Sequence, residues 1–214
     1  MQVLTYDTTQ FNFAPIVRDW FEADSLETLH TVQEYDLLTR KEDQSTRWHS
    51  IFYDKYREFD IFFEKYKLFL ATHIKPLYNE NIIYQKIPTF RIQLANNVAV
   101  GEYHKDRDYR DLEWAGRVRE LNYFLPLTDT NKFNTVWMES AEDKGDYAPA
   151  LINYGECLEW DGSNLTHGNV KNESDKTRVS VDFRVMPESR YSPSAKGSIN
   201  TNTLFQLGEY YSTL

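Results

Sequence analysis

The sequence predicts an α+β protein, in which helices of the N-terminal half back a largely antiparallel sheet sandwich or barrel. Before residue 90, apolar side chains recur every three or four positions, which is the helical period. After residue 90, short β-branched or aromatic runs are separated by Gly, Asn, Asp and Pro, as in strands joined by turns. This order favours the α+β class. The 214 residues contain no internal repeat or linker, so we expect one domain.

In the first half, a short strand is expected at residues 2–6. A helix over residues 25–35 follows, which Asp24 or Ser25 can cap. A second, longer helix should end or bend at Pro76. Its apolar positions form one continuous stripe that we expect to pack on the sheet: Trp48, Phe52, Tyr56, Phe59, Phe63, Tyr66, Leu70, Ile74 and Leu77.

The second half contains five runs with strand character, which span residues 90–100, 120–129, 133–140, 156–162 and 177–187. Alternation divides the last run between a polar face of Arg178, Ser180, Asp182 and Arg184 and an apolar face of Val179, Val181 and Phe183. The polar face either meets water or lines a polar cavity, and its place just after His167 favours the cavity. The remaining tail starts as a polar loop and ends in aromatic residues that should fold back onto the body.

The composition is that of a soluble globular protein and excludes some classes of function. A formal net charge of −9 argues against a nucleic-acid backbone as the main partner. The single Cys157 excludes an intrachain disulfide and fits a reducing compartment. The N-terminus shows no signal-peptide pattern, and no apolar run approaches the length of a membrane span. We therefore expect a cytoplasmic protein.

Three residues have the chemistry of a metal site. His104 and Asp106 form an HxD pair, and in an extended segment residues two apart point to the same side. His167 lies in a turn-rich stretch before the last strand. Two imidazoles and one carboxylate are the set that holds non-haem Fe(II) and leaves the opposite face open. Arg178, eleven residues after His167, supplies a cation that can grip a dicarboxylate co-substrate.

Each of these residues also has a simpler interpretation. An HxD pair often belongs to a surface loop, and His167 alone could be a core or loop histidine. The order of the parts favours the metal site, because HxD follows a strand and the distal histidine precedes the strand that begins with Arg178. The other histidines, His30, His49 and His73, lack acidic neighbours at ligand spacing and are interpreted as surface or packing residues.

Residues 104–185 resemble the HxD…H…RxS signature of the Fe(II)/2-oxoglutarate-dependent oxygenases. The run YGECLEWDGSNLTHGNVKNESDKTRVSVDFRV is similar to the phytanoyl-CoA-hydroxylase-like branch. RELNYFLPLTDTNKFNTVWMES, LTHGN and TRVSVDFRV also resemble small bacterial oxygenase-like proteins named after streptomycin biosynthesis. The resemblance implies a double-stranded β-helix (jelly-roll or cupin-like) catalytic core at residues 90–188, helical support at 1–89 and a tail at 189–214.

The resemblance also implies roles for individual residues. His104, Asp106 and His167 would bind iron, and Arg178 would pair with the distal carboxylate of 2-oxoglutarate with help from Ser180. Asn122 and Gln93 are candidates for the other end of the co-substrate, or equally polar residues at strand edges. The substrate wall is expected to include Arg91, Trp137, Glu139, Trp160, Asp182 and Arg184.

The implied reaction uses O2 and 2-oxoglutarate, releases succinate and CO2, and hydroxylates a small polar metabolite such as an amine, amino acid or sugar derivative. Related halogenases lack the carboxylate ligand, so Asp106 favours hydroxylation or another plain oxidation such as desaturation or demethylation. Residues 141–149 are either an acidic lid or a solvated run of charges. The protein could be a monomer or a homodimer.

Two alternatives of other classes remain at the sequence level. One is a cupin-like metal-dependent dioxygenase or isomerase that does not use 2-oxoglutarate and does not need Arg178. The other is a metal-free binding module that keeps only the fold. Replacing Arg178 separates the first alternative from the oxygenase, and metal analysis separates the second.

Overall fold

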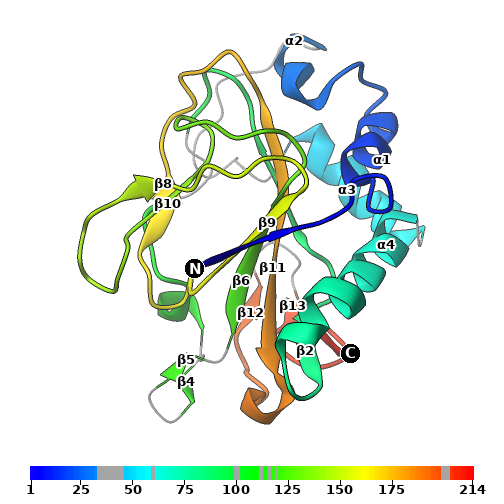
Figure 1. The fold of residues 1–214 in the computed structure, drawn as a ribbon. Coiled ribbons are helices and arrows are strands. Elements are labelled where there is room, and N and C mark those ends of the chain that lie inside the picture. Colours follow the sequence, from blue (N-terminus) through cyan, green and yellow to red (C-terminus); the bar gives the residue numbers. More distant parts are fainter. Residues whose placement is uncertain are drawn as a thin grey trace.

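The computed structural model describes residues 1–32, 46–58, 61–98, 102–110, 113–114, 117–118, 120–198 and 203–214. Helices lie along one side of a large antiparallel sheet, and a smaller sheet lies on the other side (Figure 1). The helices are α1 (Phe13–Trp20), α2 (Leu29–Val32), α3 (Arg47–Arg57) and α4 (Ile61–Phe69). None of the described helices is long and apolar enough to cross a membrane.

The large sheet has seven strands in the order β1-β9-β6-β11-β2-β14, and β3 also pairs with β11. In chain order these strands are β1 (Gln2–Thr5), β2 (Ile82–Gln85), β3 (Thr89–Gln93), β6 (Leu121–Pro126), β9 (Glu156–Trp160), β11 (Arg178–Pro187) and β14 (Tyr211–Thr213). The ten-residue β11 is central, because β6 pairs along one edge while β3 and β2 pair with successive parts of the other.

The second sheet has the order β10-β7-β8, with β7 (Val136–Met138), β8 (Ala148–Pro149) and β10 (His167–Asn169). Two small antiparallel strand pairs complete the described strands: β4 (Glu113–Trp114) with β5 (Arg117–Val118), and β12 (Gly197–Ser198) with β13 (Thr203–Leu204). One cavity is lined by side chains of β6, β9 and β11 from the large sheet and of β7 and β10 from the small sheet. The candidate site therefore lies between the two sheets.

The helices cover the opposite face of the large sheet. Val179, Val181 and Phe183 of β11 are fully buried there and belong to the same apolar cluster as the helical side chains. Tyr66 of α4 packs edge-on against Phe183, with ring centroids 5.2 Å apart. The alternation predicted for residues 177–187 is confirmed, since the apolar face meets the helices and the polar face, apart from Ser180, lines the cavity.

The structure divides the long predicted helix into two. The long helix is not continuous: α3 ends at Arg57 and α4 begins at Ile61, and Phe59 lies outside the described residues. Beyond α4, a π-helical turn (Leu70–Ile74) and a 3-10 turn (Lys75–Leu77) finish the segment, which ends one residue after Pro76, where an end or a bend was predicted.

The predicted helix at residues 25–35 begins as a 3-10 turn, Leu26–Thr28, followed by α2, and its part beyond residue 32 lies outside the described residues. Ser25 caps it as expected, since its Oγ accepts the backbone N–H of Glu27 at 3.2 Å. The short strand near the N-terminus is present as β1, and the C-terminal aromatic residues fold back through β14. Helix α1 and strand β2 were not predicted.

Candidate metal centre

The backbone brings the two predicted histidine ligands together. His104 and His167 face each other in an isolated antiparallel bridge, with N–H to carbonyl distances of 2.9 and 3.0 Å in the two directions. Residue 106 is held by a further backbone bond, in which the N–H of Asp106 donates to the carbonyl of Gly162 at 3.0 Å. Segments about sixty residues apart in sequence thus meet at one point between the sheets.

The three side chains converge as a metal-ligand set. Oδ1 of Asp106 lies 3.3 Å from Nε2 of His104 and 3.8 Å from Nε2 of His167. One ligand atom from each residue can be chosen so that all lie within 4.8 Å of one another. Each histidine has Nδ1 beside a backbone carbonyl, at 2.6 Å from Glu102 and 2.9 Å from Leu165. With Nδ1–H donating to the carbonyl, Nε2 of a neutral imidazole carries the lone pair that a metal ion binds. At His104 the metal ion would take the place of the proton that Nε2 shares with Asp106.

The electrostatics of the three groups favour a carboxylate facing imidazoles. Burial lowers the pKa of His167. At His104 burial acts in the same direction, but the hydrogen bonds to Asp106 and Glu102 outweigh it and raise the pKa. Burial alone would raise the pKa of Asp106, yet the charge of Arg184 and the bond to His104 hold it well below its ordinary value. Asp106 is therefore ionised and ready to bind a cation.

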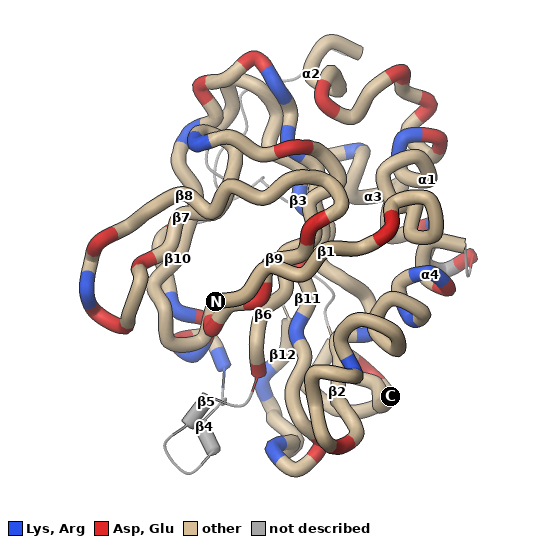
Figure 2. The backbone as a smooth tube through the Cα atoms, viewed as in Figure 1, with Lys and Arg blue, Asp and Glu red and all other residues tan. Residues whose placement is uncertain are grey.

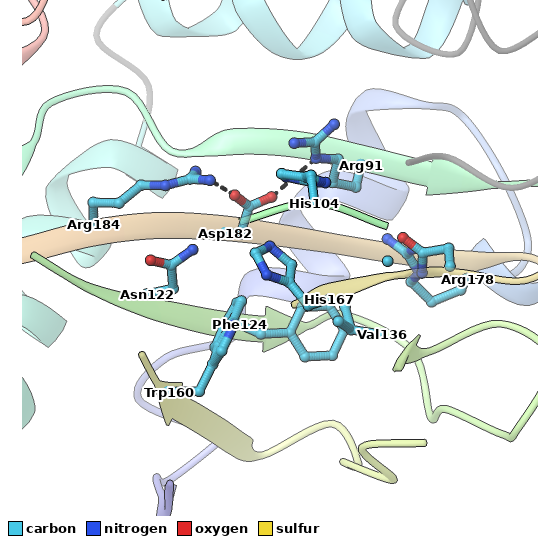
Figure 3. Close-up of a pocket in the computed structure, with 12 residues that line it drawn as sticks. Arg91, His104, Asn122, Phe124, Val136, Trp160, His167, Arg178, Asp182 and Arg184 are labelled. Carbon is cyan, nitrogen blue, oxygen red and sulfur yellow. Dashed lines mark hydrogen bonds and ion pairs between the residues drawn. The ribbon is translucent and has the colours of Figure 1, made fainter. Parts of the chain in front are cut away.

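The second oxygen of Asp106 is surrounded by protein donors. Oδ2 accepts Nδ2 of Asn122 at 2.8 Å and Nη2 and Nε of Arg184 at 3.1 and 3.4 Å. Arg184 pairs in turn with Asp182 at 2.5 Å, and the other oxygen of Asp182 accepts Nε of Arg91 at 3.0 Å. Figure 3 shows Asp182 between the two arginines on the cavity wall. Because burial opposes the charge of Asp182 while Arg91 and Arg184 favour it, its pKa is lowered.

Arg178 is a buried cation that lines the same cavity. Arg178 is only 1% exposed. Its Nε donates to the carbonyl of Asn134 at 2.9 Å, and its Nη1 donates to Oγ of Ser180 at 2.7 Å. It makes no ion pair with a carboxylate among the described residues. Burial lowers the pKa of Arg178 to about 9, and the nearby charge of Arg91 acts in the same direction. A guanidinium in this position is stabilised by an anion that enters the cavity.

The cavity has a volume of about 90 Å³. It is lined by Arg91, His104, Asn122, Phe124, Val136, Trp160, His167, Gly168, Asn169, Arg178, Asp182 and Arg184. Of the side chains predicted for the substrate wall, those of Arg91, Trp160, Asp182 and Arg184 are in this set.

Trp137 and Glu139, which were also predicted for the substrate wall, are not among the residues that line this cavity. Trp137 follows Val136 on β7, so its side chain points away from the cavity that Val136 lines. Its indole N–H donates to the carbonyl of Lys132 at 2.8 Å. The carboxylate of Glu139 accepts the backbone N–H of Thr166 at 2.6 Å, and the same bond lowers its pKa to about 2. Both residues hold the backbone around the small sheet.

The two residues suggested for the co-substrate in addition to the arginine and serine have different surroundings. Asn122 lines the cavity, but its N–H group is engaged by Asp106. Gln93 pairs across the strands with Arg178 and donates to the carbonyl of Val170 at 2.7 Å, outside the cavity lining. Ser180 is fully buried and contacts Arg178, so it acts on the cavity through that arginine.

Sequence reasoning missed four lining residues: Phe124, Val136, Gly168 and Asn169. Two of them had a detectable signal. Phe124 lies two residues after Asn122 on β6, and Asn169 lies two residues after His167 on β10, so alternation places each on the same face as a residue already singled out.

The acidic loop after β7 is joined to the HxD segment. Lys105 pairs with Asp143 at 2.6 Å, and Arg107 pairs with Glu142 at 2.8 Å. Charges of both signs follow one another along this loop as it leaves the body between β7 and β8 (Figure 2). Glu142 and Asp143 thus meet the cations on either side of Asp106, while Asp146 pairs with Lys144 within the loop.

Comparisons with known proteins add a family and a fold. No protein-family model matches the chain. The streptomycin biosynthesis protein StrG of Streptomyces griseus is 38% identical over 214 residues, which cover 99% of this chain and 97% of that protein. An apo structure of the non-heme monooxygenase ThoJ is 13% identical, covers 92% of this chain and 81% of its own, and has a TM-score of 0.52. CytC3 with Fe(II) and alpha-ketoglutarate is 9% identical, covers 87% and 72%, and has a TM-score of 0.52. The likeness to the two solved structures shows a shared fold.

Proposed function

The chain belongs to the family of the streptomycin biosynthesis protein StrG, and we propose that it is a non-haem Fe(II)- and 2-oxoglutarate-dependent oxygenase. Its core at residues 90–188 would be a double-stranded β-helix of the phytanoyl-CoA-hydroxylase-like branch, within one domain that spans residues 1–214. The fold shared with the monooxygenase ThoJ and with CytC3, which binds Fe(II) and alpha-ketoglutarate, supports this proposal.

The observation that carries the proposal is the pairing of two sites in one cavity. His104 and His167 line it beside Asp106, and Arg178 lines it as a buried guanidinium without a carboxylate partner among the described residues. A set of two imidazoles and one carboxylate suits Fe(II) with open coordination positions. A guanidinium fork binds a carboxylate in a bidentate way, which matches the distal end of 2-oxoglutarate.

Each group has a defined task in this proposal. His104, Asp106 and His167 hold the metal, and Arg178, oriented by Ser180 and Asn134, holds the co-substrate. Bound Fe(II) supplies the chemistry that couples O2 and 2-oxoglutarate, with release of succinate and CO2, to oxidation of a substrate C–H bond. Phe124, Val136 and Trp160 make part of the wall apolar and exclude water from it.

The substrate is proposed to be a small polar metabolite, such as an amine, amino acid or sugar derivative. The wall combines aromatic faces with charged and amide side chains, which suits a ligand of mixed polarity. Asp106 fills the carboxylate position of the ligand set, which favours hydroxylation, with desaturation or demethylation as related outcomes.

Succinate formation tests the proposal. The Fe(II)-loaded parent should convert 2-oxoglutarate to succinate, even slowly and without a substrate. Arg178→Ala should weaken 2-oxoglutarate binding by at least about tenfold, since a charge-assisted bond contributes about 1.5–3 kcal/mol. The affinity of Arg178→Lys for 2-oxoglutarate should lie between those of the parent and Arg178→Ala, because lysine keeps the charge but loses the bidentate guanidinium. Retained activity in Arg178→Ala without any 2-oxo acid would instead support a cupin-like dioxygenase or isomerase.

A further inference from the structure

The two side-chain oxygens of Asp106 have different surroundings. Oδ1 faces the Nε2 atoms of His104 and His167. Oδ2 faces three donors, Nδ2 of Asn122 at 2.8 Å and Nη2 and Nε of Arg184 at 3.1 and 3.4 Å. A carboxylate oxygen has two lone-pair sites, so these donors saturate Oδ2. Asp106 is left with one oxygen to offer on the side of the imidazoles.

The donors themselves are held rigidly. Asn122 of β6 and Arg184 of β11 are directly paired across the two strands, so both project from neighbouring positions of one sheet. Arg184 is 6% exposed and is fixed at its far end by Asp182, whose other oxygen binds Arg91. Figure 3 shows this row of charged side chains along the central strand. The row connects a candidate metal ligand to the cavity wall through three successive ion pairs.

We propose that Arg184, assisted by Asn122, is a positioning residue that fixes the orientation of Asp106 and so prepares the site for its metal ion. The proposal rests on the proposed function, because it takes Asp106 to be a ligand. It gives Arg184 and Asn122 a role different from contact with substrate or with 2-oxoglutarate. Groups that orient a ligand commonly contribute a factor of about 10 to 100 in metal affinity.

Positioning and simple charge predict opposite effects on metal affinity. Arg184 is a cation next to the place where a divalent cation would bind. If its charge were its main effect, removing it would relieve repulsion and strengthen metal binding. If it orients Asp106, removing it frees the carboxylate to turn, and binding weakens. The sign of the change therefore decides between them.

The experiment measures binding of Co(II) alone to the full-length protein, by calorimetry and by the visible absorption of the bound ion. We expect Arg184→Gln to raise the Kd for Co(II) by about 10- to 100-fold. Arg184→Lys, which keeps the charge but cannot form the fork, should lie between this variant and the parent. Asn122→Ala removes one donor to the same oxygen and should weaken binding in the same direction.

Arg110→Lys is the matched control for loss of a buried arginine contact. Arg110 pairs with the fully buried Glu120 and makes no described hydrogen bond with Asp106. Its replacement should lower the melting temperature without changing the Kd for Co(II) by more than about threefold. Should Arg184→Gln not fold, Arg184→Lys and Asn122→Ala still test positioning, because weaker Co(II) binding in both supports it and an unchanged Kd in both contradicts it.

The outcomes separate this inference from the proposed function. A Kd for Co(II) that is unchanged or lower in Arg184→Gln, or a weakening of equal size in Arg110→Lys, overturns the positioning role alone. A folded parent that binds no Co(II) refutes the metal site itself and therefore both claims. Weakened binding in Arg184→Gln, partial recovery in Arg184→Lys and an unaffected Arg110→Lys support the role.

Discussion

Gly162, whose carbonyl bonds to the candidate metal ligand Asp106, is closely packed against two other side chains. A Cβ added there would lie 2.5 Å from Nδ2 of Asn122 and 2.9 Å from Nε1 of Trp160. The carbonyl of Gly162 also accepts the backbone N–H of Asp106. The absence of a side chain at this position therefore leaves room for the amide that holds Asp106.

Gly162→Ala should displace Asn122 from Asp106 and weaken Co(II) binding by about tenfold, in line with other losses of ligand support. Calorimetric titration of Co(II) measures the effect. Ser163→Ala is the control, since the buried Oγ of Ser163 has no partner among the described residues and its removal should be nearly neutral. Equal Co(II) affinity in Gly162→Ala and the parent would show that the close approach does not matter.

At this scale the sequence predicts the ligands better than the groups that orient them. The HxD spacing and the alternation along residues 177–187 depend on local geometry, which is readable from neighbouring residues. The bonds from Arg184 to Asp106 join positions 78 residues apart, and no local pattern encodes such a pairing. Trp137 and Glu139 were assigned to the substrate wall by residue type alone, and neither is among the residues that line the cavity.

At the scale of elements, helix α3 packs on β3 partly through a buried histidine. His49 is 3% exposed, bonds through Nδ1 to Oγ1 of Thr46 at 2.8 Å, and lies edge-on to Phe90 with ring centroids 5.2 Å apart. Burial lowers the pKa of His49 to about 3, and the charge of Arg91 acts in the same direction.

This pKa predicts acid sensitivity in a defined window. Between the ordinary histidine value of about 6.5 and the folded value of about 3, the unfolded chain binds a proton that the folded chain does not. The free energy of unfolding should therefore fall as pH decreases through this window, by up to about 1.4 kcal/mol per unit from His49. His49→Gln, neutral throughout, should show a shallower decline in urea unfolding. Identical slopes for both proteins would contradict the assignment.

The C-terminal strand β14 is joined by a buried hydrogen bond to Glu120, the residue that precedes β6. Tyr211 of β14 donates to Oε2 of Glu120 at 2.6 Å, and Arg110 pairs with the other oxygen. Tyr211→Phe removes a donor from a fully buried carboxylate, so the free energy of unfolding should fall by about 1–3 kcal/mol.

Urea unfolding tests this value, with Tyr147→Phe as the control. Tyr147 is 39% exposed, and its variant should stay within about 0.5 kcal/mol of the parent. A loss in Tyr211→Phe no larger than in the control would mean that the bond contributes nothing to stability.

The elements themselves were unevenly predictable. The strands β3, β6, β7, β9 and β11 lie within or overlap the predicted runs because β-branched and aromatic residues and turn residues mark them. Strand β2 escaped because all four residues are buried, which removes the alternation that identifies a half-exposed strand. The break between α3 and α4 was hidden because the apolar spacing continues across it.

At the scale of the whole molecule, two sheets enclose the cavity and the helices brace the large sheet from behind. The almost fully buried β11 is the shared element, since one face holds Val179, Val181 and Phe183 against the helices and the other presents Arg178, Asp182 and Arg184 to the cavity. Ligands in the cavity should therefore stabilise the entire fold.

Thermal unfolding measures this coupling. Co(II) at 100 times its Kd should raise the free energy of unfolding by about 2.7 kcal/mol. 2-Oxoglutarate should add a further increment when Co(II) is present. Arg178→Ala should keep the increment from the metal and lose the one from 2-oxoglutarate. If 2-oxoglutarate stabilised Arg178→Ala as much as the parent, 2-oxoglutarate would bind away from Arg178.

The most direct test of the central claim is an anaerobic titration of 2-oxoglutarate into the Fe(II)-loaded protein, followed by visible absorption. A weak charge-transfer band of the chelate should develop in the parent, be absent in His167→Ala and be weakened in Arg178→Ala. That result would establish that His167 and Arg178 serve one Fe(II) and 2-oxoglutarate site. Bound iron with no band at saturating 2-oxoglutarate would contradict the account and favour a cupin-like metalloenzyme.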